Sequence, residues 1–257
     1  MRRLSFNTIF VCAAVLIVIL SGCGLTKSRM KSDRDADAHH MLGIAYLNEN
    51  NLQLAFMEFV KAVELNPNEK TYHYALGHVY FKMNKFNEAV KEYSNALTID
   101  PEYGDAHNAL GVVYGKMERW DDAISEYQKA LNIPHYSSPQ QARSNLGTAY
   151  FNKDDYQSAM IEFREAIKLQ PEVAVFHLWL GHTYMNLDMT RDAIDAYGEV
   201  IKRDPMNVEA YYNLGLAHFK EDNKEGALAA FKKVVAISPN SSTAAEAMKY
   251  IQVLGKQ

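Results

Sequence analysis

Nine histidines are the residues of this 257-residue chain whose type best suits metal binding or proton transfer. Four of them share one recurring position, four residues before a glycine: His39, His73, His107 and His177. A position that recurs along a chain is typical of packing, so we interpret these four as structural. His73 with His78, and His177 with His182, are five residues apart, whereas two ligands on one helix face need a spacing of four. We therefore predict no metal site.

Motifs for catalysis are absent from the sequence. There is no His-Glu-x-x-His zinc motif, no glycine-rich phosphate loop and no Gly-x-Ser-x-Gly nucleophile turn. The acidic pairs Asp121-Asp122 and Asp154-Asp155 fall where helices are expected to begin, and negative charge there complements the helix dipole. We predict that the chain is not an enzyme and uses no cofactor.

The two cysteines, Cys12 and Cys23, both lie near the N-terminus. Arg2 and Arg3 precede the apolar run 9–20, which is too short to span a bilayer but fits the apolar core of a secretory signal. The tetrad that follows, Leu20-Ser21-Gly22-Cys23, resembles the bacterial lipobox. That resemblance implies that Cys23 is lipidated and becomes the first residue of the mature chain. An ordinary signal peptide with a chance cysteine is the alternative.

These features predict where the chain works and exclude one class of partner. A mature chain with no free thiol suits an oxidising compartment. Gly24 stands where an aspartate would retain an enteric-type lipoprotein in the inner membrane, so the resemblance implies an outer-membrane protein that faces the periplasm. Attached acyl chains would hold it to the membrane. The formal net charge of -4 and the lack of a basic cluster argue against nucleic acid as a partner.

A repeat must position any functional surface of this chain. Glycine returns at intervals of 34, 34, 36, 34 and 34 residues: Gly43, Gly77, Gly111, Gly147, Gly181 and Gly215. An alanine follows each glycine by twelve residues: Ala55, Ala89, Ala123, Ala159, Ala193 and Ala227. Most units close with a proline: Pro67, Pro101, Pro171, Pro205 and Pro239. Three series in one register predict a helical hairpin repeated six times.

The residue types explain why the hairpin repeats. Glycine within a helix costs about 1 kcal/mol relative to alanine, so we infer that the first helix of each unit packs closely against the second. An aromatic residue follows each alanine by four and shares its face: Phe59, Tyr93, Tyr127, Phe163, Tyr197 and Phe231. This pattern resembles the tetratricopeptide repeat (TPR). The resemblance implies an all-α, right-handed superhelix of six helix-turn-helix repeats.

The domain organisation follows from these patterns. We predict a lipoprotein signal peptide at 1–22, the lipidated cysteine with a polar tether at 23–35, six repeats at 36–241 and a capping helix at 242–257. A solenoid needs such a helix because its last repeat would otherwise expose an apolar face.

The junction between the third and fourth repeats is two residues longer than the others. It reads Pro134-His135-Tyr136-Ser137-Ser138-Pro139 and precedes Asn145-Leu146-Gly147. A tolerated loop insertion is one interpretation. The junction also resembles that of the type IV pilus biogenesis lipoproteins, the TPR pilotins that help secretin subunits reach and assemble in the outer membrane. With the lipobox and the six repeats, this resemblance implies a pilotin; a general envelope scaffold that docks cell-wall enzymes or a protease is the alternative.

Function is then expected on the surface that the first helices of a TPR array line, its concave side. Four positions around each repeat glycine supply the candidates for a partner-binding groove: Tyr74, His78, Phe81, Val112, Phe151, Leu178, His182, Met185, Tyr212, Leu216 and Phe219. Thr148 and Val175 occupy equivalent positions. This lining is aromatic and aliphatic, and it lacks the lysines of a carboxylate-clamp TPR. It suits an amphipathic helix or an extended apolar segment of a partner protein.

Two alternatives remain for these candidates. Some of the side chains can pack between neighbouring repeats instead of facing a partner. Trp179 lies two residues before its glycine, where no other repeat has a tryptophan. It is therefore either a core residue or an anchor for the partner.

Overall fold

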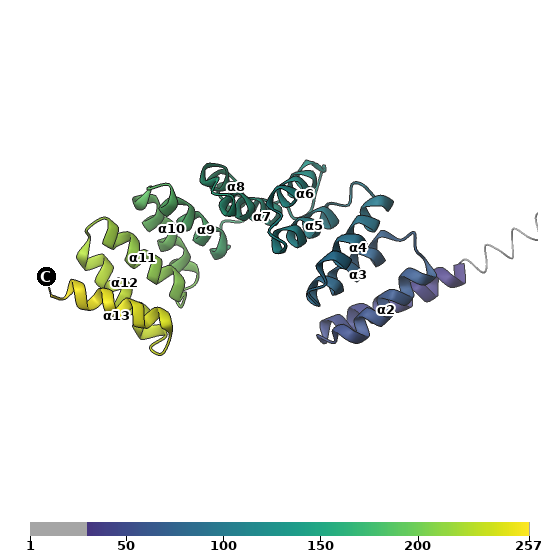
Figure 1. Ribbon diagram of the computed structural model, residues 1–257, viewed down its shortest axis with the longest axis horizontal. Helices are drawn as coiled ribbons and strands as arrows, with labels where there is room; N and C mark the ends of the chain where they lie inside the picture. The colour runs from purple at the N-terminus through teal and green to yellow at the C-terminus, as the bar shows by residue number, and fades with distance from the viewer. Residues whose placement is uncertain (1–29, 257) are drawn as a thin grey trace, which may run out of the picture. The chain divides into compact units, whose positions relative to one another are not determined.

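The computed structural model describes residues 30–256, and this part of the chain is helical throughout, with no strand (Figure 1). It forms two compact units that divide between Ala106 and His107, and we describe each by itself. The expected signal peptide, Cys23 and the start of the tether lie outside the described residues. None of the helices within 30–256 is long and apolar enough to cross a membrane.

Helical hairpins follow one another in both units. The first unit contains the helical residues 30–48, α2 Leu52–Leu65, α3 Lys70–Lys82 and α4 Phe86–Ile99. Helix α5, Gly104–Lys116, includes the division point. The second unit continues with α6 Trp120–Asn132, α7 Pro139–Asn152, α8 Tyr156–Leu169, α9 Ala174–Asn186, α10 Thr190–Arg203, α11 Val208–Lys220, α12 Lys224–Ile237 and α13 Ser242–Leu254. The odd-numbered helices α3 to α11 are thus first helices of repeats, and the even-numbered ones are second helices.

Each hairpin turns through one residue in the left-handed backbone region, with φ between 56° and 60°: Asn50, Asn84, Glu118, Asp154, Asp188 and Asp222. Asparagine and aspartate tolerate this conformation best among residues with a side chain. The next residue caps the second helix in several repeats; for example, Asp155 accepts a hydrogen bond from the Ser158 amide at 3.1 Å. Asp121 and Asp122 lie in the first turn of α6. The predicted placement of these acidic pairs at helix starts is confirmed.

The repeat glycines make the close helix contact that their spacing predicts. A Cβ atom added to Gly181 would lie 2.5 Å from Cε1 of Tyr197, and one on Gly43 would lie 2.6 Å from Cε1 of Phe59. The other four repeat glycines meet the aromatic ring of their own second helix in the same way. The glycine and aromatic series are therefore the two sides of one contact, in which the ring lies directly on the helix backbone.

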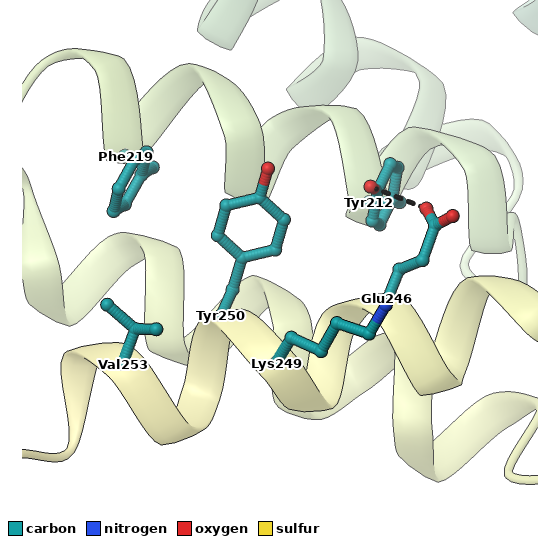
Figure 2. A pocket seen from close by; sticks show the side chains of 6 residues that line it. All are labelled: Tyr212, Phe219, Glu246, Lys249, Tyr250 and Val253. Carbon is teal, nitrogen blue, oxygen red and sulfur yellow. Dashed lines mark hydrogen bonds between the residues drawn. The ribbon is translucent and has the colours of Figure 1, made fainter.

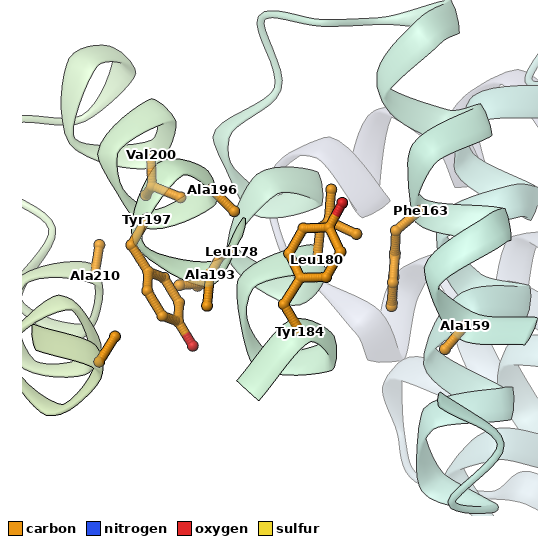
Figure 3. Packing of buried hydrophobic residues seen from close by; sticks show 11 residues of the cluster. Ala159, Phe163, Leu178, Leu180, Tyr184, Ala193, Ala196, Tyr197, Val200 and Ala210 are labelled. Carbon is orange, nitrogen blue, oxygen red and sulfur yellow. The ribbon is translucent and has the colours of Figure 1, made fainter. Parts of the chain in front are cut away.

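The core of the second unit shows how these contacts build a continuous interior. Figure 3 shows Phe163 of α8 and Tyr197 of α10 on either side of α9, with Leu178 and Leu180 between them. Both rings are fully buried. Burial of a large apolar side chain contributes about 1.5–3 kcal/mol, so each hairpin depends on its neighbours for most of its stability.

The first helix begins earlier than the expected end of the tether. Residues 30–35 were expected in the tether but are already helical. This segment has no apolar residues at helical spacing, and polar contacts hold it in place instead. Ser32 Oγ donates to the Leu65 carbonyl at 3.1 Å, and Asn66 Nδ2 donates to Asp33 at 3.2 Å. Ala36 then begins the buried face.

At the other end, α13 covers the last repeat as a capping helix. Its buried residues are Ala244, Ala247 and Leu254, which pack with Phe231 and Val234 of α12. Ala245 and Met248 of the same helix are exposed.

The long junction between α6 and α7 is a loop, as its two prolines predict. Helix α6 ends at Asn132, and Pro139 is the first residue of α7, where its missing N–H is not needed. Within the loop, His135 adopts a φ of 60° and Tyr136 is half-buried.

Candidate functional site

The recurring histidines pair with a glutamate of the second helix, 19 residues later. The imidazole Nδ1 of His39 lies 2.5 Å from Glu58, that of His73 lies 2.7 Å from Glu92, and that of His107 lies 2.6 Å from Glu126. In the fourth repeat Arg143 takes the place of the histidine, 2.8 Å from Glu162. We call these pairs the His–Glu ladder. The ladder joins the two helices of a repeat, so these positions are structural.

The second repeat shows the charge state of a ladder pair. His73 contacts Glu92 through Nδ1 and donates through Nε2 to the Pro67 carbonyl at 3.0 Å, so both ring nitrogens face acceptors. The hydrogen bond with Glu92 raises the pKa of His73. Burial acts to raise the pKa of Glu92, but hydrogen bonds from His73 and Asn95 outweigh it and lower the pKa overall. The pair is therefore an imidazolium and a carboxylate.

We expect His73→Gln to destabilise the protein by about 1–2 kcal/mol at pH 5.5 and by less at pH 8.5. The raised pKa of His73 gives stability that is full below the unfolded pKa of about 6.5 and is lost as the pH rises through the folded value. The lowered pKa of Glu92 gives stability that is lost at acidic pH, below about 4.5. Urea unfolding of both proteins at the two pH values measures the difference. Equal losses at the two pH values would contradict the charged pair.

Candidate groove residues of the first unit lie on α3. Tyr74 packs against the rings of Tyr93 and Tyr103, with centroids 5.5 and 5.3 Å away. Phe81 packs against Phe86 at 6.0 Å. His78 is half-buried, and its burial lowers the pKa of the imidazole. Each of these side chains is thus partly buried against neighbouring residues and partly exposed to solvent.

In the second unit, Val112 of α5 lines a cavity of about 250 Å³. Thr148 of α7 lines it as well, so two expected first-helix positions meet here. Trp120 of α6 adds an aromatic wall. Asn145 completes the rim and donates to Asn108 at 3.0 Å.

Trp179 is the centre of an aromatic cluster on α9. Its ring stacks on Phe163 with an angle of 11° between planes, and it meets the edges of Phe151 at 5.4 Å and His182 at 5.7 Å. The indole remains partly exposed. Trp179 thus packs against its neighbours like a core residue, and its partly exposed surface also leaves room for contact with a partner.

Leu178 requires a correction. It was expected in the groove, but its side chain is 9% exposed and lies in the core of the second unit with Tyr197 (Figure 3). Its position on α9 points it between α9 and the neighbouring helices, so it offers a partner almost no surface. Met185 of the same helix is partly buried against this core, and Leu216 of α11 is partly buried against the core of the last repeat.

A cavity with a volume of about 510 Å³ lies between α11 and α13. Figure 2 shows the side chains that surround it: Tyr212, Phe219, Glu246, Lys249, Tyr250 and Val253. We call this site the α11–α13 cavity. Tyr212 and Phe219 were expected from the sequence. The four residues of α13 were missed, because the pattern of the capping helix was read only as a cover for the core.

Aromatic and polar contacts fix the walls of the α11–α13 cavity. Phe219 meets the edge of Tyr250 at 5.4 Å, and the Tyr212 hydroxyl donates to Glu246 at 2.9 Å. Burial and that hydrogen bond raise the pKa of Tyr212 to about 12. Phe219 and Val253 are 43% and 52% exposed, so their apolar surface is open to a ligand.

These groups suit binding better than catalysis. The cavity offers aromatic and aliphatic surface with a carboxylate and an ammonium group at its edge, and no histidine, cysteine or serine lines it. Across residues 30–256, no group of three or more His, Cys, Asp or Glu side chains could hold a metal ion.

Comparison with known proteins agrees with the fold. Models of the tetratricopeptide repeat match successive stretches of the chain: 36–69, 77–118, 106–135, 140–173 and 176–242. The chain is therefore a tandem array of tetratricopeptide repeats. Among curated proteins, none matches the sequence.

Several solved structures share this architecture. Pseudomonas aeruginosa pilF has a TM-score of 0.75 and 20% identity, over 85% of this chain and 99% of its own. PilW, described as a widely conserved type IV pilus biogenesis factor, has a TM-score of 0.77 and 18% identity, over 83% and 98%. YrrB, described as a TPR protein with an unusual peptide-binding site, has a TM-score of 0.63 and 25% identity, over 74% and 97%. At 18–20% identity, the first two likenesses are likenesses of fold.

Proposed function

We propose that this protein is a scaffold that captures a segment of a partner protein in the α11–α13 cavity. The observation that carries the proposal is the open apolar surface of Phe219 and Val253 on facing helices. Exposed apolar patches with a polar rim are typical of protein-binding sites. An amphipathic helix or an extended apolar segment would bury this surface against α11 and α13.

The rim charges restrict the segment further. Glu246 already accepts a hydrogen bond from Tyr212, whereas Lys249 has no partner within the described part of the chain. A segment with an apolar side chain for the cavity and an acidic group for Lys249 would fit best.

More specifically, we propose that the protein is a pilotin that assists secretin assembly at the outer membrane for type IV pilus biogenesis. The lipobox at Leu20-Ser21-Gly22-Cys23, the long junction and the likeness of fold to pilF and PilW support this role. The lipid anchor on Cys23 would hold the array at the membrane. A general envelope scaffold for cell-wall enzymes or a protease is the second candidate, because an apolar groove serves either.

We expect Cys23→Ala to release the protein from the membrane fraction into the soluble periplasmic fraction, with the repeats still folded. Several acyl chains give effectively stable attachment, and a chain without them has no other anchor in this proposal. Fractionation of cells, with circular dichroism of the purified variant, measures both points. A variant that remains in membranes like the parent would refute the anchor.

The same variant tests the pilotin role. Secretin multimers should become scarce or accumulate away from the outer membrane, as judged by immunoblots of separated membranes. Normal multimers in the outer membrane, with the variant fully released, would favour the general scaffold.

A further inference from the structure

The fifth repeat contains a second cavity that the α11–α13 site does not explain. It lies over α9 between the second helices α8 and α10 and has a volume of about 380 Å³. Ile167, Leu180 and Ala196 supply apolar walls, and the imidazole of His177 contributes to its lining. We call it the His177 pocket.

The His–Glu ladder shows what is missing from this pocket. The glutamate that follows the histidine by 19 residues in the first three repeats is replaced by Ala196 in the fifth. The fourth repeat keeps the glutamate, Glu162, and pairs it with Arg143, whereas the sixth lacks both members and has Tyr211 and Ala230 in their places. Among the six repeats, only the fifth keeps the histidine and lacks the carboxylate.

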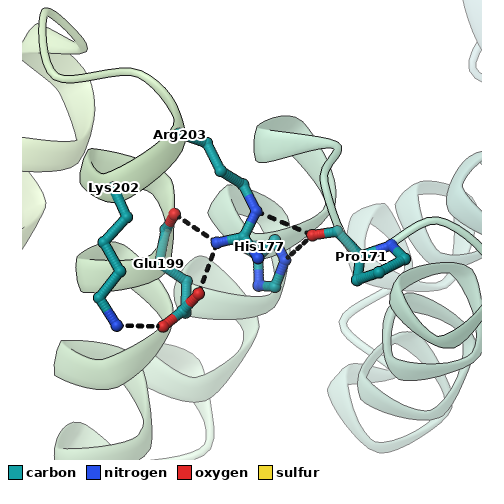
Figure 4. Close-up of polar contacts among 5 residues, drawn as sticks. All are labelled: Pro171, His177, Glu199, Lys202 and Arg203. Atoms are coloured by element: carbon teal, nitrogen blue, oxygen red, sulfur yellow. Dashed lines mark hydrogen bonds and ion pairs between the residues drawn. The ribbon is translucent and has the colours of Figure 1, made fainter.

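His177 consequently has a hydrogen-bond partner within the described residues at only one of its two ring nitrogens. Nε2 donates to the Pro171 carbonyl at 2.8 Å, which also accepts from Arg203 Nε at 2.8 Å (Figure 4). Nδ1, the atom that contacts glutamate in the other repeats, has no partner within residues 30–256. The residue is only 7% exposed. Burial lowers the pKa of His177, which favours the neutral ring in the free protein.

One wall of the pocket carries the positive charge of Arg164. Arg164 of α8 donates through Nε to the Tyr184 hydroxyl at 2.9 Å but has no carboxylate partner in the described chain. The corresponding residues of the other second helices that precede a repeat are uncharged: Val60, Ser94, Gln128 and Gly198. Lys232 of α12 is the one other cation at this position in the sequence, and α12 precedes the capping helix instead of a repeat.

The remaining charged groups leave Arg164 and His177 available. On α8, Lys168 pairs with Glu165. On α10, hydrogen bonds from Arg203 and Lys202 lower the pKa of Glu199 to about 2. Its carboxylate therefore stays ionised, and these two cations compensate its charge. Asp192 and Asp195 are exposed on the outer edge, where water screens them. The second and third repeats carry an acid at the position of Asp192, Glu88 and Asp122, and still hold their ladder glutamates.

We propose that the His177 pocket binds the carboxylate of a glutamate or aspartate side chain from a partner polypeptide, in the place that Glu58, Glu92 and Glu126 fill within their own repeats. The acidic side chain enters between α8 and α10, its stem lies against the apolar walls, and its carboxylate accepts from a protonated His177 and from Arg164. This site is independent of the α11–α13 cavity, so one scaffold can hold two segments at once.

The first test supplies the missing carboxylate within the chain. In Ala196→Glu, the pKa of His177, followed by NMR, should rise above its wild-type value, and the Tm should not fall. Ala230→Glu is the matched control: it places the same side chain opposite Tyr211 instead of a histidine, so its Tm should be lower than that of Ala196→Glu. An unchanged or lower pKa of His177 in Ala196→Glu would overturn the proposal.

The second test uses a randomised 12-residue peptide library displayed on phage and selected on the full chain, with Ala196→Glu for counter-selection. Enriched peptides should carry an acidic residue whose change to the amide weakens binding about tenfold or more, the loss of one charge-assisted hydrogen bond. Their affinity should increase from pH 8 to pH 6, because His177 must take up a proton. Binding should persist in Phe219→Glu, which separates this pocket from the α11–α13 cavity.

Three outcomes would overturn the inference. The selection can return no peptide that discriminates against Ala196→Glu. It can return peptides whose acidic residue is dispensable. It can also return basic peptides that bind more weakly at pH 6, which would mean that His177 Nδ1 accepts from a lysine instead.

Discussion

Gly181→Ala is expected to lower the free energy of unfolding by about 1–3 kcal/mol, the usual cost of overpacking a filled core. The added Cβ would lie 2.5 Å from Cε1 of Tyr197, closer than side chains can approach. Tyr197 is fully buried in the core of the second unit and has no space to withdraw into. Either the ring leaves its rotamer or α9 and α10 move apart.

Gly198→Ala is the matched control on α10. A Cβ at Gly198 would meet nothing within 4 Å, so this change should stabilise the helix by up to about 1 kcal/mol. Alanine brings the same gain in helix propensity at both positions, and the difference between the two variants therefore isolates the clash. Denaturant unfolding of the three proteins measures it. A Gly181→Ala variant as stable as Gly198→Ala would show that the glycine contact is not what holds the repeat together.

Phe219→Glu is expected to reduce partner affinity by a factor of a thousand or more while the array stays folded. The new carboxylate would be desolvated on binding, and burying such a charge costs several kcal/mol. Because Phe219 is 43% exposed in the free protein, the charge remains in water there and the fold tolerates it.

Met248→Glu provides the control for this prediction. Met248 is 40% exposed on α13 but does not line the cavity, so its change introduces the same charge on the same helix outside the site. Co-purification of the partner from envelope extracts with each variant compares them, with circular dichroism to show that both are folded. Equal capture by Phe219→Glu and the wild type would exclude the cavity as the binding site.

The helices and their close contacts could be predicted from the sequence because the same residue types recur at the same helix contact in all six repeats. Gly43 and Phe59, for instance, have equivalents in every unit, so their contact is visible as two series in register. Positions without a repeat are harder to predict. The start of the first helix before Ala36 rests on polar contacts of Ser32 and Asp33, which leave no apolar period to recognise.

The binding surfaces were predictable only in part, for the same reason. Tyr212 and Phe219 follow from the repeat, but Tyr250 and Val253 belong to α13, which has no equivalent to compare. The prediction for Leu178 was wrong because the side chain is buried in the core of the second unit, and its place in the repeat alone did not show this.

The His177 pocket illustrates a different limit. The sequence identifies the recurring histidine as structural, but its glutamate partner lies on the other helix, 19 residues away. The absence of that glutamate at Ala196 becomes meaningful only when the ladder pairs are seen in space.

Site-specific photocrosslinking in the native cell tests the central claim most directly. A photoreactive phenylalanine analogue at position 219 should form a covalent adduct with one envelope protein, because the side chain lies within the partner's binding site. The same analogue at Met248 should form none, since that position is exposed on α13 but does not line the cavity. In the pilotin proposal the adduct is the secretin subunit. No adduct from position 219, or the same adducts from both positions, would contradict the account.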